Sequence, residues 1–251
     1  MKSSITDTDK YRGIIKLMLQ NESTFNNFKQ LPEYTEVLEH VSYKLGIEYL
    51  AVIKRDNPQL LERIDEFKMN DLHGNPKWFS YDGIGGISPT TLRYIKVLSD
   101  LIKLGIDLTD KNVIEIGVGY GGQCLIISKY FKFKSYTLVD LKEPLDLTKK
   151  YLELSNVNNV KFKEMSELGE KSIYDLVISN YAFSECAKEI QHIYSEKVLK
   201  NSKNGYITTN FTSDIYNINS YNKEELLGLV EDSYAIDEEP LTGKNNMILV
   251  W

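Results

Sequence analysis

Apolar residues recur at helical spacing through the first quarter of the chain. Stripes of Ile, Leu, Val and Met fall within residues 14–19, 37–53 and 60–67. Apolar positions three and four residues apart line one face of a helix, and Pro32 stands where one such helix should begin. We therefore predict a helical region at the N-terminus. It would cap one edge of the main domain, or else serve as a substrate lid or a dimer contact.

From Lys111 onward, short apolar runs alternate with amphipathic segments. Continuous apolar runs are typical of buried parallel strands, and their alternation with helices predicts a doubly wound α/β sheet with right-handed crossovers. The expected strands are 112–116, 135–139, 159–163, 174–178, 205–210, 234–237 and 247–251. The expected helices are 121–130, 144–155, 187–200 and 222–231. No helix separates the last two strands, which predicts an antiparallel C-terminal hairpin in a mostly parallel, seven-stranded sheet.

Residues 68–90 join these regions and show little periodicity, although they contain several aromatic side chains. A long irregular segment in a compact chain is usually functional or disordered, and the aromatic residues argue against disorder. Ser88 and Pro89 then provide an N-cap and a first helical residue. We divide the chain into a helical cap with a substrate loop, residues 1–87, and a cofactor-binding domain, residues 88–251.

Composition narrows the possible partners. The 251 residues carry a formal net charge of −6, which argues against broad binding to the nucleic-acid backbone. The two cysteines, Cys124 and Cys186, form neither a disulfide framework nor a metal-binding spacing. No stretch resembles a signal peptide or a membrane span. We therefore expect a cytoplasmic protein with a small-molecule substrate.

The stretch from Asn112 to Ser128 carries the clearest chemistry, because a predicted strand runs into a glycine-rich turn and then a helix. Gly117, Gly119 and Gly122 satisfy G-x-G-x-x-G, a pattern that lets a nucleotide-like ligand approach the backbone. Asp140 ends the next strand about 25 residues after Glu115, where an acidic side chain would bind ribose hydroxyls. This pair alone fits either a dinucleotide or S-adenosylmethionine (SAM).

Three further features favour SAM. Glu115 lies two residues before the first glycine, where a carboxylate suits a cationic amino group better than a pyrophosphate. The glycine turn comes late in the chain, and only one nucleotide-binding half follows it. The predicted hairpin then ends the chain.

Together these features resemble the class I SAM-dependent methyltransferases over residues 111–251. The resemblance implies a Rossmann-like methyltransferase fold in which Glu115 to Gly119 wrap the methionine end of SAM. It also implies that Asp140 binds the ribose, that residues near Ser166 border the adenine, and that residues 179–185 face the transferred methyl group.

A narrower resemblance covers more of the chain. The blocks Gly74–Pro76, Ser88–Tyr94, Glu115–Gln123 and Ser179–Glu185 occur in an order similar to that in sugar O-methyltransferases of bacterial surface-polysaccharide clusters. The implied substrate is a sugar hydroxyl, on a nucleotide-linked sugar or a surface polysaccharide.

A sugar hydroxyl is a weak acid, so methyl transfer to it calls for a general base. Glu185 is the first candidate, with capping of the following helix as the alternative. His192 is the second, and a surface or packing role is the alternative. A divalent metal could replace the base; Asp214 could then be a ligand, but the sequence indicates no metal site.

Other polar and aromatic residues complete the expected site, with ordinary packing as their alternative. Arg93 could pair with the SAM carboxylate or a substrate phosphate, and His40 is expected on a helix surface. The expected cofactor-binding residues are Arg93, Glu115, Gly117, Gly119, Tyr120, Gly121, Asp140, Ser166, Asn180 and Tyr181. The expected substrate-binding residues are His73, Tyr81, Thr90 and Phe183.

Two competing interpretations stay open. The glycine fingerprint also permits an NAD(P)-dependent oxidoreductase. A methyltransferase-like domain could instead act only as a binding partner, and a homodimer is compatible with either function.

Overall fold

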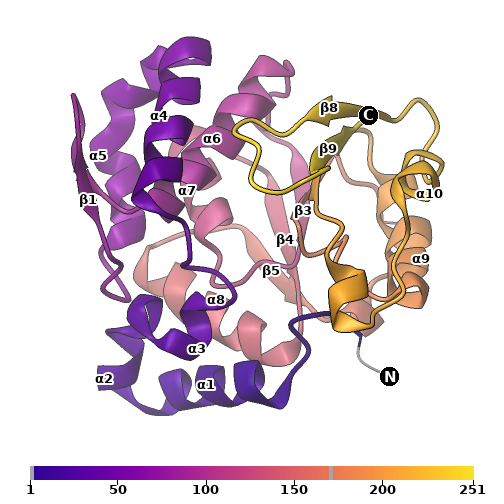
Figure 1. Ribbon diagram of the computed structural model, residues 1–251, viewed down its shortest axis with the longest axis horizontal. Coiled ribbons are helices and arrows are strands. Elements are labelled where there is room, and N and C mark those ends of the chain that lie inside the picture. Colours follow the sequence, from indigo (N-terminus) through magenta and orange to yellow (C-terminus); the bar gives the residue numbers. More distant parts are fainter. Residues whose placement is uncertain (1–2, 170–171) are drawn as a thin grey trace.

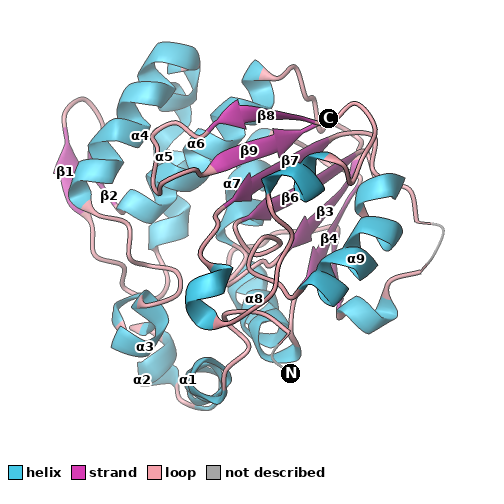
Figure 2. Cartoon of the chain, turned by 45° about the vertical axis from the view of Figure 1, so that its right-hand side comes forward, coloured by secondary structure: helices cyan, strands magenta, loops and turns pink. Residues whose placement is uncertain are grey.

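The structure is a computed structural model that describes residues 3–169 and 172–251. Its centre is a seven-stranded sheet in the order β5-β4-β3-β6-β7-β9-β8. The strands are β3 (Asn112–Ile116), β4 (Ser135–Val139), β5 (Val160–Lys163), β6 (Leu176–Asn180), β7 (Gly205–Thr209), β8 (Tyr234–Asp237) and β9 (Met247–Val250). β3 to β7 are parallel, and β9 runs antiparallel to both β7 and β8 (Figure 2). This topology confirms the predicted α/β fold class, including the antiparallel C-terminal strand.

Alternating strand residues divide the core between the two faces of the sheet. Val113 of β3 belongs to one apolar cluster, and its neighbour Ile114 belongs to the other. The first cluster contains residues of α6 (Pro89–Lys103), α7 (Gly122–Tyr130) and α8 (Lys142–Leu154). The second contains residues of α9 (Lys188–Lys197), η5 (Leu199–Asn201) and α10 (Lys223–Leu227). The central strands are therefore covered on both faces, as their apolar runs require.

The N-terminal third is helical, as predicted. It consists of α1 (Asp9–Gln20), α2 (Glu22–Phe25), η1 (Phe28–Gln30), α3 (Pro32–Thr35), α4 (Tyr43–Asp56), η2 (Pro58–Arg63), α5 (Ile64–Phe67) and η3 (Lys68–Asp71). α1 packs against α8 and α4 against α6, so these helices lie along the helical layer of the sheet (Figure 1). The side chain of Lys29 is buried at this junction, where its Nζ donates to the carbonyl of Asn70 at 2.5 Å.

Several local boundaries differ from the sequence-based expectation. The segment 68–90 contains a hairpin, β1 (Phe79–Tyr81) and β2 (Gly85–Ile87), whose turn includes Gly83 at φ +82°. Three residues per strand are too few to show a periodic pattern. β6 begins at Leu176 rather than residue 174, because Tyr174 makes only an isolated bridge to Ser202. The structure confirms the expected start of α6, since the Ser88 hydroxyl accepts from the backbone N–H of Thr91.

Within the described residues, no helix is both long and apolar enough to span a membrane.

Candidate functional site

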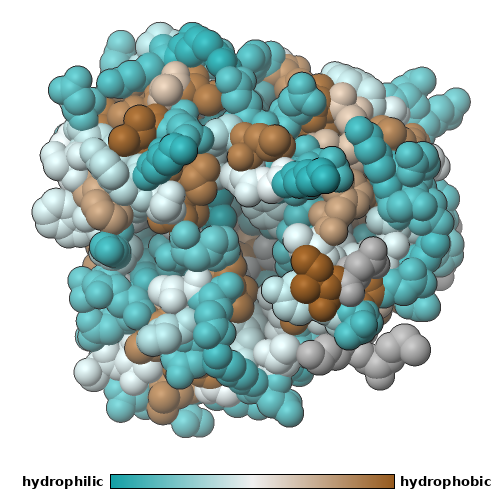
Figure 3. Space-filling view, viewed as in Figure 1, coloured by the Kyte–Doolittle hydropathy of each residue, from teal (hydrophilic) through white to brown (hydrophobic). Residues whose placement is uncertain are grey.

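A cavity of about 560 Å³ lies at the carboxyl ends of the parallel strands. Figure 3 shows the corresponding face hollowed between the N-terminal helices and the C-terminal half of the chain. Residues that follow β3, β4, β5, β6 and β7 all line it, together with parts of the N-terminal helices. This is where open α/β sheets bind ligands, and the volume is in the range for small-molecule sites.

The glycine loop after β3 forms one wall of the cavity. Gly117 and Gly119 have φ values of +75° and +60°, a region that disfavours other residues. A Cβ on Gly117 would lie 2.0 Å from the Cβ of Ala182, and one on Gly119 would lie 2.6 Å from Leu38 Cδ1. Backbone conformation therefore favours glycine at both positions, and at Gly117 the neighbouring Ala182 also leaves no space for a side chain.

Asp140, directly after β4, braces this loop. Its Oδ2 accepts hydrogen bonds from the backbone N–H groups of Val118 at 2.8 Å and Gly119 at 3.2 Å. Burial raises the pKa of Asp140 to about 6, although these hydrogen bonds act in the opposite direction. The carboxylate thus joins two neighbouring strand ends and lines the cavity at the same time.

Glu115 brings a second carboxyl group to the same end of the cavity. Its side chain is buried in β3 and accepts a hydrogen bond from the Tyr136 hydroxyl at 2.7 Å. Burial is the main reason why its pKa rises to about 8. Among the described residues, no lysine or arginine forms an ion pair with it. A cationic ligand group in the cavity would supply the missing charge.

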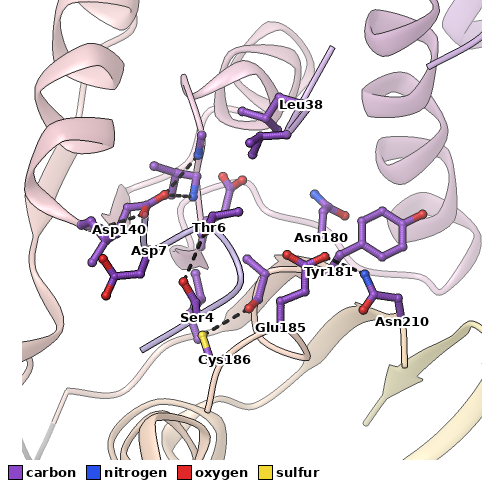
Figure 4. A pocket seen from close by; sticks show the side chains of 18 of the residues that line it. Ser4, Thr6, Asp7, Leu38, Asp140, Asn180, Tyr181, Glu185, Cys186 and Asn210 are labelled. Carbon is purple, nitrogen blue, oxygen red and sulfur yellow. Dashed lines mark hydrogen bonds between the residues drawn. The ribbon is translucent and has the colours of Figure 1, made fainter. Parts of the chain in front are cut away.

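The opposite end of the cavity is formed by the loops after β6 and β7 (Figure 4). Asn180 ends β6 and Tyr181 follows it with a φ of +67°. Glu185 lies farther along the same loop, where its Oε1 accepts from Asn210 Nδ2 at 2.6 Å. Burial raises the pKa of Glu185. α9 starts at Lys188 with Ala187 as its N-cap residue, so Glu185 lies before the first turn and its carboxylate does not cap the helix.

A segment from Ser3 to Asp7 lines the cavity, which the sequence did not indicate. The backbone N–H of Ile5 donates to the carbonyl of Glu185 at 3.1 Å, and that of Ala187 donates to Ser3 at 2.9 Å. Asp7 lies beside Asp140 in Figure 4. No local motif marks this segment, because its contacts are with residues about 180 positions away.

The loop between β8 and β9 also reaches the cavity, through Thr242 and Asn246. The buried Glu238 carboxylate accepts from the Tyr181 hydroxyl, from the Thr242 backbone N–H at 2.9 Å and from Asn246 Nδ2 at 3.1 Å. These bonds hold Tyr181 against the C-terminal loop. A buried glutamate in a short polar loop gave no recognisable signal in the sequence.

The structure brings most of the expected cofactor residues together. The cavity is lined by Arg93, Glu115, Gly117, Gly119, Asp140, Ser166, Asn180, Tyr181 and Glu185. The Arg93 Nε is buried and has no hydrogen-bond partner among the described residues. His40, expected on a helix surface, also lines the cavity.

Other expected site residues lie elsewhere. Gly121, Tyr120 and Phe183 are not among the lining residues. Tyr120 and Phe183 are fully buried, and Asn70 Nδ2 donates to the Tyr120 hydroxyl at 3.1 Å. A Cβ on Gly121 would lie 2.7 Å from Thr148 Cγ2, so that glycine allows loop and helix to pack. These three residues pack behind the cavity wall and do not line the cavity.

The remaining candidates are also outside the cavity lining. His192 is exposed on α9, and His73 packs edge-on against the ring of Tyr151, 6.1 Å between centroids. Tyr81 and Thr90 are buried. Helical periodicity and residue type could not distinguish these packing roles from contact with a substrate.

The described side chains include no group of three or more His, Cys, Asp or Glu residues arranged to hold a metal ion. The side chain of Asp214 lies outside the described residues.

No protein-family model matches the sequence, and no curated protein matches it. Solved methyltransferase structures show a distant likeness. A SAM-dependent methyltransferase from Clostridium acetobutylicum is 10% identical over 61% of this chain and 87% of its own, with a TM-score of 0.48. The magnesium protoporphyrin IX methyltransferase of Synechocystis, solved with bound SAM, is 16% identical over 63% and 76%, also at 0.48.

A Galdieria sulphuraria structure named for a sarcosine dimethylglycine methyltransferase is 18% identical, with a TM-score of 0.46. The match covers 58% of this chain and 65% of that one, slightly under two thirds of its length. Likenesses of this size do not identify a substrate or a reaction.

Proposed function

We propose that this cavity binds SAM and that the protein transfers its methyl group to a sugar hydroxyl, on a nucleotide-linked sugar or a surface polysaccharide. One observation carries the proposal: the glycine loop, Glu115 and Asp140 line the same cavity as the buried carboxyl group of Glu185. In Figure 4, Asp140 lies on one side and Asn180, Tyr181 and Asn210 on the other, with Glu185 between them. We assign the first side to a cofactor subsite and the second, which begins at Glu185, to an acceptor subsite.

The first end fits SAM chemically. Gly117 and Gly119 line the cavity, and their positive φ values turn the loop so that its backbone faces a ligand. The carboxyl groups of Glu115 and Asp140 also line the cavity and suit an ammonium group and ribose hydroxyls, respectively. Arg93, whose Nε has no partner among the described residues, suits the carboxylate of the methionine moiety. Ser166, in η4 (Met165–Glu167), lines the same cavity and would border the adenine.

The second end fits a weakly acidic acceptor. When bound, SAM would supply a methyl group attached to a positively charged sulfur. The acceptor oxygen attacks the methyl carbon from the side opposite the sulfur, and the carbon–sulfur bond breaks. The main task of the protein is to hold the oxygen, the carbon and the sulfur in line. The ionised Glu185 carboxylate accepts the hydroxyl proton and later releases it to water, an effect worth roughly 10²–10⁴-fold in rate.

Neutral polar side chains share the cavity with Glu185, as recognition of a sugar requires. The cavity lining includes the amide groups of Asn180, Asn210 and Asn246 and the hydroxyl groups of Thr212 and Thr242. Each can donate and accept hydrogen bonds, so together they match the mixed donors and acceptors of a sugar ring. The resemblance of the sequence to sugar O-methyltransferases supports the same acceptor.

The test is transfer of labelled methyl groups from SAM to a panel of nucleotide sugars and surface oligosaccharides. We expect transfer to at least one acceptor. Glu185→Gln should slow turnover at least about tenfold while leaving the affinity for S-adenosylhomocysteine (SAH) unchanged. Glu153→Gln, at an exposed position of α8, is the matched control. SAH binding without transfer to any acceptor in the panel would favour the non-catalytic interpretation.

A further inference from the structure

A single amide holds the candidate base in place. Among the described residues, the only hydrogen bond to the Glu185 carboxylate comes from Asn210 Nδ2, at 2.6 Å. Both side chains line the acceptor end of the cavity (Figure 4). We propose that Asn210 is the positioning residue for Glu185: it aims the carboxylate at the acceptor and keeps it able to take a proton. This inference rests on the proposed function and extends it by one residue.

The direction of the Asn210 amide follows from its two partners. The ionised Glu185 carboxylate can only accept, so the amide NH₂ group must face it. The Asn210 Oδ1 then points away from Glu185 and accepts from the Thr212 hydroxyl at 3.1 Å. Thr212 therefore gives the amide a second anchor in the orientation that Glu185 requires.

The backbone of Asn210 is held as well. Its N–H donates to the Ser184 hydroxyl at 3.0 Å, and that hydroxyl donates to the carbonyl of Tyr181 at 2.7 Å. The loop after β7 is thereby fastened to the loop after β6, which carries Glu185. Asn210 and Glu185 therefore belong to two loops whose backbones are linked to each other by hydrogen bonds.

A neutral donor is the appropriate partner for a base in this position. An arginine or lysine would hold the carboxylate ionised but would weaken its basicity, because a direct positive charge stabilises the anion strongly. Asn210 offers a hydrogen bond without a charge. The ionisable groups that line the same cavity include Asp7, Asp140, Cys186 and Tyr194, and also the cations Arg12 and Arg93 and the imidazole of His40. Arg12 pairs with Asp7 and Glu143. Among the described residues, no cation forms an ion pair with Glu185, so the amide of Asn210 is its one direct partner.

The experiment is a pH titration of the Glu185 carboxyl carbon by ¹³C NMR in the full chain, using Glu185→Gln to assign the signal. We expect Asn210→Ala to raise the pKa of Glu185 by about one unit, since a hydrogen bond to a charged group is lost. Thr212→Val, which leaves Asn210 in place, should raise it by less. Asn158→Ala, at an exposed loop position, should leave it unchanged. An unaltered titration in both Asn210→Ala and Thr212→Val would overturn the proposal.

Kinetics provide an independent readout. The acid limb of the pH–rate profile should move to higher pH in Asn210→Ala, and turnover at neutral pH should fall about tenfold. Glu185→Gln combined with Asn210→Ala should be no slower than Glu185→Gln alone, because Asn210 acts through Glu185. Additive losses would show that Asn210 contacts the acceptor on its own. The NMR titration requires no turnover, so an inactive wild-type protein would refute the proposed function while still testing the role of Asn210.

Discussion

The two ends of the cavity are assembled in different ways. At the cofactor end, the wall is one continuous stretch from Glu115 to Gly119, braced by Asp140 from the adjacent strand. At the acceptor end, the wall combines residues 3–5, the loops after β6 and β7, and the loop between β8 and β9. The first is a feature of local backbone conformation, and the second depends on the whole fold.

This difference indicates which substitutions each end of the cavity can tolerate. Backbone conformation and close packing define the cofactor end, so an added methyl group is enough to damage it. Side chains from separate segments define the acceptor end, so individual substitutions there should alter turnover or acceptor choice without loss of the cofactor. Each of the following predictions tests that contrast.

The largest effect is expected from Gly117→Ala. The added Cβ would lie 2.0 Å from that of Ala182, and φ is +75°. We expect SAH affinity to fall about 100-fold or more and stability by roughly 1–3 kcal/mol, measured by calorimetry and thermal unfolding. The matched control is Gly13→Ala in α1, where a Cβ has no neighbour within 4 Å; it should gain about 0.5–1 kcal/mol. Normal SAH affinity in Gly117→Ala would contradict a backbone-defined subsite.

Asp140→Ala should have the next largest effect. It removes the acceptor of two loop N–H groups as well as the proposed ribose ligand. We expect SAH affinity to fall at least about tenfold, and less in Asp140→Asn, which keeps one acceptor oxygen.

Asp140 also predicts the pH dependence of binding. With a pKa of about 6, the carboxyl group is protonated at pH 5 and ionised at pH 7.5, so wild-type SAH affinity should weaken at the lower pH. Equal affinities at the two pH values would argue against an ionised Asp140 as a ligand.

The buried Glu115 carboxyl group should make the stability of the ligand-free protein depend moderately on pH. Its ordinary pKa is 4.5, and burial raises it to about 8. Between these pH values the folded state keeps a proton that the unfolded state releases, so the free energy of unfolding should fall as pH rises, by up to ~1.4 kcal/mol per unit. Glu115→Gln should flatten that slope in chemical denaturation, whereas Glu153→Gln should not. Identical slopes in the wild type and Glu115→Gln would contradict the assignment.

His192→Ala is expected to have the smallest effect. The side chain is exposed on α9 and outside the cavity lining. Turnover should stay within about twofold of the wild type, and stability within ~0.5 kcal/mol. A tenfold loss of turnover would restore His192 as a catalytic candidate.

The sequence predicted the sheet and the cofactor end well, for a physical reason. The features that predicted them are local. They are the apolar runs of the strands, the closely spaced glycines and the carboxylates at the strand ends, and each can be recognised in the sequence before the fold is known. Glu115, Gly117 and Asp140 could therefore be expected at one site, and all three line the cavity. Glu185 could be expected near the same site because it follows the end of a predicted strand by a few residues.

The acceptor end was harder, because its contacts join distant segments. Asn210 lies 25 residues from Glu185, and Ser3 pairs with Ala187 across most of the chain. Neither pairing leaves a spacing signal. Aromatic residue type was also misleading, since Tyr120 and Phe183 are core residues that only resemble ligand-binding ones.

The central claim, that the glycine loop and its two carboxylates form a SAM site, is tested most directly by calorimetric titration of the purified protein with SAH and, separately, with NADH. We predict one SAH site per chain, weakened in Asp140→Ala, and no detectable heat from NADH. Binding of NADH without binding of SAH would contradict the account and favour the oxidoreductase interpretation.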